Sequence, residues 1–229
     1  MTDKTYQEDF LYRHKNPYHE KLEQFDHFVL RDNECEQFKG RWNSDVFKNE
    51  KDIHLEVGSG YGQFMLEYCQ KENNINFIGL DYRFKRSFTL VKKINKLNIK
   101  DVKYLRARGE RIQYIFDENE VSRIFYFFPD PWPKARHKKK RLFNQAFLDQ
   151  AHKILKKDGQ FWIKTDHDDY AEQMEELIGK NTNKFEIKLS TLDLYKEFPE
   201  NIMCSFQTKF EKIFLDKKTP IKAFLLSKI

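Results

Sequence analysis

The chain has 229 residues, of which 39% are hydrophobic and 16% aromatic, so its composition favours a folded core over disorder. Lys and Arg outnumber Asp and Glu by 42 to 36, a net charge of +6 that suits a polyanionic partner without requiring one. The three cysteines lie far apart and lack metal-ligand spacing, which argues against a disulfide framework and gives no reason to expect a metal.

Membrane and export signals are missing from the sequence. No apolar run approaches the ~20 residues that cross a bilayer, and the first five residues carry charges where a signal peptide needs an apolar stretch. We therefore expect a soluble, cytoplasmic protein with no membrane partner, either a monomer or a homodimer.

Residues 1–50 are polar and aromatic without steady periodicity, and we expect an N-terminal arm that is partly helical. From residue 51 to residue 229 the pattern becomes one domain of alternating strands and helices. Strands are expected at 53–57, 77–80, 102–105, 124–128 and 161–164, with two more candidates near 184–190 and 222–227. Helices are expected up to about residue 70 and at 83–97, 141–156 and 170–178, the third ended by Asp158-Gly159.

Seven strands separated by helices predict an α/β fold with a Rossmann-like, doubly wound, mostly parallel sheet. Such sheets bind ligands outside the carboxyl ends of their strands, where the strand order reverses. The unusual residue clusters of this chain stand at those strand ends.

The first of these clusters is a glycine turn after the first strand, Gly58-Ser59-Gly60-Tyr61-Gly62, preceded by Glu56. The spacing differs from the G-x-G-x-x-G of dinucleotide folds, and an acid here would repel a pyrophosphate but suit a cationic amino or sulfonium group. Asp81 ends the second strand, where a carboxylate can accept both hydroxyls of an adenosine ribose. The pattern favours S-adenosylmethionine over a nicotinamide, and a nicotinamide oxidoreductase or a glycine turn without ligand remain the alternatives.

The second cluster ends the fourth strand, where Pro129 and Pro131 flank Asp130 and Trp132 follows. The prolines hold the backbone of one carboxylate, which can bond the edge of a planar base while an aromatic ring stacks on it. A similar motif, in a different order, occurs in enzymes that methylate exocyclic amines. The plainer interpretation is a proline-rich loop with a packed tryptophan.

The third cluster is basic, with six cations and no acid in residues 134–141. A charge run is usually a solvated surface, but this one adjoins the predicted site. We therefore expect Arg136, Lys138 and Lys139 to contact RNA phosphates.

Together these segments resemble the bacterial tRNA (guanine-N7)-methyltransferases, which are class I S-adenosylmethionine-dependent methyltransferases. The resemblance covers roughly residues 50–229 and rests on residues 55–60, 127–132, 134–137, 165–166, 170–172 and 208–211. It implies that S-adenosylmethionine is the cofactor, tRNA the partner, and Asp130 the acidic residue of the catalytic site. The donor pocket that it implies comprises Glu56, Gly58, Gly60, Asp81 and Asp130.

The same resemblance implies a binding site for the target guanosine, formed by Lys134, Asp166, Thr208, Lys209, Phe210 and Glu211. Without it, Asp166 would be taken as a helix cap and Thr208 would be unremarkable. One position departs from the family, since Arg108 stands where an acid usually contacts the adenine and Glu110 is a shifted candidate. The target implied is N7 of a guanine, at position 46 of the variable loop.

Guanine N7 carries an in-plane lone pair and no proton, so its attack on a methyl group needs no general base. We expect positioning and nearby carboxylates, Asp130 and Asp166, to stabilise the cationic ring that forms. Two alternatives remain: an exocyclic-amine methyltransferase acting on RNA or DNA, and a non-catalytic RNA-binding module with a methyltransferase-like fold.

Overall fold

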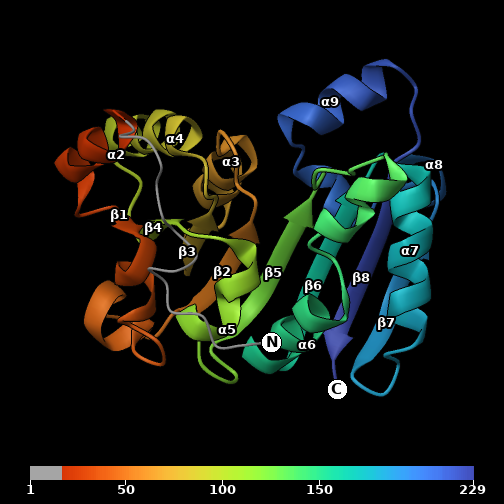
Figure 1. The fold of residues 1–229 in the computed structure, drawn as a ribbon, viewed down its shortest axis with the longest axis horizontal. Coiled ribbons are helices and arrows are strands. Elements are labelled where there is room, and N and C mark those ends of the chain that lie inside the picture. Colours follow the sequence, from red (N-terminus) through yellow and green to blue (C-terminus); the bar gives the residue numbers. More distant parts are fainter. Residues whose placement is uncertain (1–16) are drawn as a thin grey trace.

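The computed structural model of the chain describes residues 17–229, which form one eight-stranded sheet with helices on both faces (Figure 1). The strands lie in the order β1-β4-β3-β2-β5-β6-β8-β7. Their bounds are β1 (Val29–Arg31), β2 (Asp52–Val57), β3 (Ile75–Leu80), β4 (Val102–Arg106), β5 (Val121–Phe127), β6 (Leu155–Thr165), β7 (Phe185–Thr191) and β8 (Lys222–Lys228). Every pair from β1 to β6 is parallel, whereas β8 runs antiparallel to both β6 and β7.

The helices divide between the two faces of the sheet. The longer ones are α3 (Gln63–Lys71), α4 (Phe84–Leu97), α6 (Gln145–Ile154), α7 (Asp168–Gly179) and α9 (Lys209–Asp216). The short ones are α2 (Pro17–Lys21), α5 (Ile112–Ile115), α8 (Leu194–Glu197), the 3-10 helices η1 (Leu22–Phe25), η2 (Asp32–Glu36), η4 (Gly109–Arg111), η5 (Ala135–Lys140) and η6 (Ile202–Ser205), and the π-helix η3 (Trp42–Phe47). Two hydrophobic cores result, one beneath α3 and α4 and the other beneath α5, α6 and α7.

The predicted α/β architecture is confirmed, but the sheet has eight strands and not seven. The additional strand, β1, lies in the segment that we expected to be an arm, and it pairs in parallel with β4. Its three residues are too few to show a periodicity in the sequence. Trp42 of the same segment is fully buried and donates from Nε1 to the carbonyl of Ile115 at 2.9 Å. The described part of the arm therefore shares the sheet and the core of the main domain, while residues 1–16 lie outside the described residues.

The expected helix at 141–156 is shorter in the structure. Asn144 caps α6, because its side chain accepts a hydrogen bond from the amide of Phe147 at 3.1 Å. The prediction that Asp158-Gly159 ends this helix is wrong, since strand β6 already begins at Leu155 and contains both residues. Asp158 has a φ of +61°, a local irregularity within the strand.

The strand order reverses at β2, with β3 and β4 on one side and β5 and β6 on the other. Parallel sheets leave a crevice at such a point, outside the carboxyl ends of the strands. Gly62 allows α3 to begin close to α4 there, because a Cβ on Gly62 would lie only 2.1 Å from a methyl carbon of Leu90.

None of the helices between residues 17 and 229 has both the length and the apolarity to span a membrane.

Candidate active site

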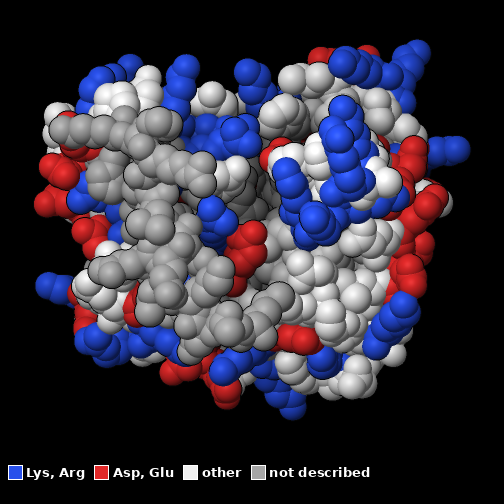
Figure 2. Space-filling model, in the orientation of Figure 1, with Lys and Arg blue, Asp and Glu red and all other residues white. Residues whose placement is uncertain are grey.

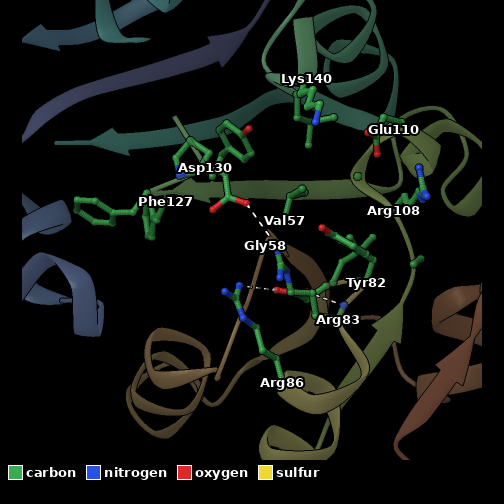
Figure 3. Close-up of a pocket in the computed structure, with 18 of the residues that line it drawn as sticks. Val57, Gly58, Tyr82, Arg83, Arg86, Arg108, Glu110, Phe127, Asp130 and Lys140 are labelled. Carbon is green, nitrogen blue, oxygen red and sulfur yellow. Dashed lines mark hydrogen bonds and ion pairs between the residues drawn. The ribbon is translucent and has the colours of Figure 1, made fainter. Parts of the chain in front are cut away.

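A cavity of about 390 Å³ opens at this reversal point (Figure 3). Its wall is made largely by residues at the carboxyl ends of four neighbouring parallel strands, namely 57–58 at the end of β2, 80–83 at the end of β3, 107–110 after β4 and 126–130 at the end of β5. Its size is within the range of small-molecule and cofactor sites. Gly58, Asp81 and Asp130, which the sequence assigned to one pocket, all line this cavity.

Gly58 forms the floor next to β2 and has a φ of +92°, a region that side chains with a Cβ rarely adopt. A Cβ placed on it would meet no atom within 4 Å, so the backbone conformation, and not crowding, explains the glycine. Its amide donates to the carbonyl of Leu80 at 2.7 Å, which ties the glycine turn to the end of β3.

Asp81 is the acid expected to bind the ribose, and it lies at the cavity wall with only 6% of its surface exposed. Its two carboxylate oxygens accept hydrogen bonds from the amides of Gly60 at 3.0 Å and Arg83 at 2.9 Å. Burial raises the pKa of Asp81, while these amides and the nearby Arg86 oppose that rise. Gly60 thus holds the acid in place, and each oxygen retains acceptor capacity for a ligand hydroxyl.

Glu56 lies directly behind the glycine turn, at the end of β2, and is 4% exposed. Its Oε2 has no hydrogen-bond partner among the described residues. Burial raises its pKa to about 8, although a hydrogen bond with Ser59 favours the charged form. A buried carboxylate oxygen without a partner is costly, and a cationic ligand group at the glycine turn would satisfy it. The residues present therefore fit a methyl-donating cofactor that carries a positively charged amino group and a sulfonium.

The loop after β5 holds Asp130 in a strained backbone. Phe128 and Trp132, on either side of the Pro129-Asp130-Pro131 sequence, have φ values of +49° and +43°. Strain of this kind persists only where neighbouring structure holds it and is common at functional sites. Asp130 is 60% exposed at the cavity mouth, and its Oδ2 lies 3.9 Å from Nη2 of Arg83 on the opposite wall.

Arg141 explains how this loop is held. Its guanidinium is almost fully buried, donates from Nε to the carbonyl of Pro131 at 2.8 Å and from Nη1 to Gln173 at 2.7 Å, and forms an ion pair with Asp169. The charge run in the sequence includes Arg141 among its six cations, but the structure gives this one an anchoring role between the loop and α7.

The remaining cations of the run form one rim of the site on η5 (Figure 2). Arg136 and Lys139 are exposed and have no ion-pair partner among residues 17–229. Lys138 instead pairs with Asp169, whose pKa the Lys138 and Arg141 side chains lower to about 2. Lys140 lines the cavity, with its Nζ 4.7 Å from the centre of the Trp132 ring.

The residues expected to hold guanosine lie outside the cavity lining. Lys134 is exposed just before η5, and Asp166 is half-buried after β6. Thr208 caps α9, accepting from the amide of Glu211 at 3.0 Å, while Lys209 and Phe210 are exposed at the start of that helix.

Glu211 is fully buried, and a contact with guanosine would require its present bonds to open. Both of its carboxylate oxygens lie 2.7 Å from Nζ of Lys164, and Tyr195 donates to it at 2.9 Å. Lys164 also donates to the carbonyls of Met203 and Phe206. The pair therefore attaches α9 and the segment before it to β6.

The structure also adds cavity residues that the sequence interpretation missed. Tyr82, Arg83, Arg86 and Lys140 line the wall, the first three within five positions after Asp81. For the three residues after β3, their position beyond the carboxyl end of a strand could have indicated a place in the site. Arg108 and Glu110 are both exposed and both line the cavity (Figure 3). Among the described residues, no group of three or more His, Cys, Asp or Glu side chains could hold a metal ion.

The chain is similar in sequence to known methyltransferases. A family model described as "Putative methyltransferase" matches residues 50–224. A tRNA (guanine-N(7)-)-methyltransferase of Clostridium tetani is 37% identical over 175 residues, covering 76% of this chain and 82% of that protein. A bifunctional glycosyltransferase/methyltransferase of Fusobacterium nucleatum is 37% identical over 204 residues, but the chain spans only 31% of that protein's length. The solved 16S rRNA methyltransferase KamB has a TM-score of 0.62 at 13% identity, covering 82% of this chain and 93% of that one.

The sheet order, the reversed strand β8 and the cavity at the carboxyl ends define a class I, Rossmann-like methyltransferase fold. The likeness to KamB supports the same fold. The chain belongs to the tRNA (guanine-N(7)-)-methyltransferase family.

Proposed function

We propose that this protein transfers the methyl group of S-adenosylmethionine to N7 of a guanine in tRNA. The observation that carries the proposal is the convergence of Gly58, Asp81 and Asp130 on one cavity, with the unpartnered Oε2 of Glu56 behind it and the cations of η5 beside it. The named activity of the Clostridium tetani relative supports the same reaction.

The donor site would be held by residues on three strand ends. Glu56 would face the cationic amino-acid end of the donor, Gly58 would allow the close backbone approach, and Asp81 would accept from the ribose hydroxyls. When bound, S-adenosylmethionine supplies an electrophilic methyl group on a positively charged sulfur. Asp130 stands at the mouth of the same cavity and would lie close to the bound donor.

The guanine needs to be oriented and its developing charge stabilised, because N7 carries no proton to remove. We assign this work to Asp130, whose rigid loop fixes its carboxylate at the cavity mouth, and to Asp166 as a second carboxylate. Lys134, Lys209 and Phe210 are exposed and would contact the nucleotide from outside the cavity. Arg136 and Lys139, free of acidic partners among the described residues, would bind phosphates.

The test is methylation of unmodified tRNA with a labelled donor, followed by nucleoside analysis. We expect 7-methylguanosine, identified by chain cleavage after reduction and aniline treatment. Label on an exocyclic amine would instead establish the amine methyltransferase, and tRNA binding without label would indicate the non-catalytic module. A tRNA with adenine in place of guanine 46 tests the variable-loop position, and retained methylation would overturn that assignment.

A further inference from the structure

A second acid-free basic segment lies on the other side of the cavity from η5. Residues 83–100 contain seven Lys and Arg side chains and no Asp or Glu. The segment begins at the carboxyl end of β3 and includes all of α4. The site described above uses only its first turn.

Three lysines of α4 form an exposed ridge, which we define as Lys85, Lys92 and Lys96. Their separations of seven and four residues place them on one face of the helix. The opposite face, with Leu90, Val91 and Ile94, is buried against the sheet. At ~1.5 Å of rise per residue, the ridge is long enough to follow several phosphates of a nucleic-acid strand.

The ridge lysines have no ion-pair partner among residues 17–229, which distinguishes them from three lysines on and beside α6, β6 and α7. Lys153, Lys156 and Lys180 are paired with Glu118, Asp52 and Glu176 at 3.3, 2.7 and 2.6 Å. Cations without a compensating acid retain their full charge for an external anion.

The ridge starts at the cavity. Arg83 and Arg86 line the wall below it, and their guanidinium carbons lie 5.5 Å from the ring centre of Tyr82 and 5.8 Å from that of Tyr61. Both tyrosines are 45% exposed. Exposed aromatic rings combined with cations are the side chains that bind unstacked bases and the phosphates next to them.

We propose that the ridge binds the ribose-phosphate backbone of the tRNA on one side of the target nucleotide, while η5 binds it on the other. The two basic elements belong to opposite halves of the sheet, α4 to the half with β3 and β4 and η5 to the half with β5 and β6 (Figure 1). The cavity opens between these halves. A nucleotide turned out into the cavity would then have its flanking phosphates held on both sides. This inference rests on the proposed function, since it takes tRNA to be the substrate.

An anionic membrane is a poorer partner for this surface. Helices that bind membranes insert an apolar face between lipids, whereas the apolar face of α4 already packs against the sheet. A surface of cations beside exposed tyrosines, adjoining a concave site, fits RNA.

The test compares a ridge variant, K85Q/K92Q/K96Q, with a matched variant, K153Q/K156Q/K180Q, that removes the same charge from lysines that are paired with acids. Binding of unmodified tRNA is measured from about 0.05 to 0.3 M salt, a range in which phosphate contacts dominate the affinity. We expect the ridge variant to bind at least about tenfold more weakly at low salt, with a salt slope smaller by about two to three. The matched variant should keep the wild-type slope. Binding of S-adenosylmethionine, measured by calorimetry, should be the same in both variants, since the ridge lysines do not line the cavity.

A ridge variant with the wild-type salt slope, in a protein that methylates tRNA, overturns the inference and leaves the proposed function standing. If wild-type protein fails to methylate tRNA but its binding still depends on the ridge, the proposed function fails and the RNA-binding surface stands. An equal loss of tRNA affinity in the ridge variant and the matched variant shows a general charge effect and also overturns the inference. The inference is likewise overturned if the wild-type protein binds anionic vesicles but not tRNA.

Discussion

Arg83 and Asp130 face each other across the mouth of the cavity, 3.9 Å apart between Nη2 and Oδ2. They come from different halves of the sheet, Arg83 after β3 and Asp130 after β5. Both side chains are about half exposed, so the pair is weak and can exchange for contacts with ligands. The proposed catalytic carboxylate therefore has a cation beside it that is available to other anions.

The first prediction concerns Asp130. Replacing it by Asn keeps its shape but removes the charge that would stabilise the cationic guanine, and we expect turnover to fall by roughly 100-fold or more. Affinity for tRNA should stay near the wild-type value, because removing an exposed carboxylate does not weaken phosphate binding. Single-turnover methylation and filter binding measure the two quantities separately, and an equal loss of both would refute the assignment.

The second prediction concerns Glu56 and pH. Its pKa is raised to about 8 in the folded protein from an ordinary value of 4.5, so between these values the folded state binds a proton that the unfolded state has lost. The free energy of unfolding of the donor-free protein should therefore fall as pH rises through this window, by up to roughly 1.4 kcal/mol per pH unit from this group. Glu56→Gln cannot ionise and should lose this dependence.

Urea unfolding of the wild type and the Glu56→Gln variant from pH 5 to pH 9 checks the prediction. As the pH rises toward 8, the free energy of unfolding of the variant should increasingly exceed that of the wild type. Above pH 8 this difference should stay constant. If the unfolding free energies of the two proteins change with pH in parallel, the pKa of Glu56 is not raised by folding. The same variant should bind the donor more weakly, since the partner for its cationic group is lost.

Much of the fold was accessible from the sequence because the strands of a parallel sheet are continuous apolar runs bounded by helices. The prediction failed where the decisive contact is distant in the chain. Strand β1 has only three residues and is fixed by pairing with β4, more than seventy positions away. Arg141 looked like one more surface cation, and only the fold brings Asp169 and Pro131 to it.

The site residues also divide into those that the sequence indicates and those that only the fold reveals. Glu56, Gly58, Asp81 and Asp130 stand at strand ends, and parallel strands bring their ends together whatever the loops do. The α9 residues were assigned by resemblance alone, and nothing local in the sequence indicates that Glu211 is buried against Lys164. The α4 ridge was missed because its lysines are spread over a helix and form no contiguous run.

The third prediction separates the cations of η5. Lys138 is partly neutralised by Asp169, whereas Arg136 and Lys139 have no such partner among the described residues. The double variant R136Q/K139Q should therefore weaken tRNA binding and reduce its salt slope by about two. The single variant K138Q should have a smaller effect than either R136Q or K139Q alone. Salt titrations of tRNA binding decide this, and a dominant effect of Lys138 would contradict the ion pairing seen here.

The fourth prediction concerns the buried pair of Lys164 and Glu211. Replacing Lys164 by Met leaves the carboxylate of Glu211 buried with only Tyr195 and the amide of Thr208 as donors. Breaking a buried pair in this way should lower the free energy of unfolding by about 3–5 kcal/mol. Because Lys164 also holds the carbonyls of Met203 and Phe206, α9 should loosen and the KM for tRNA should rise more than kcat falls.

The double variant K164M/E211Q supplies the control, because it removes both charges and keeps the capping side chain at Glu211 as an amide. Its unfolding free energy should exceed the value expected by adding the two single effects, by about 1 kcal/mol or more for residues in direct contact. Purely additive losses in urea unfolding would show that the two charges do not stabilise each other. A double variant that regains stability but not tRNA affinity would place Lys164 among the residues that position α9 for the substrate, beyond its contribution to the core.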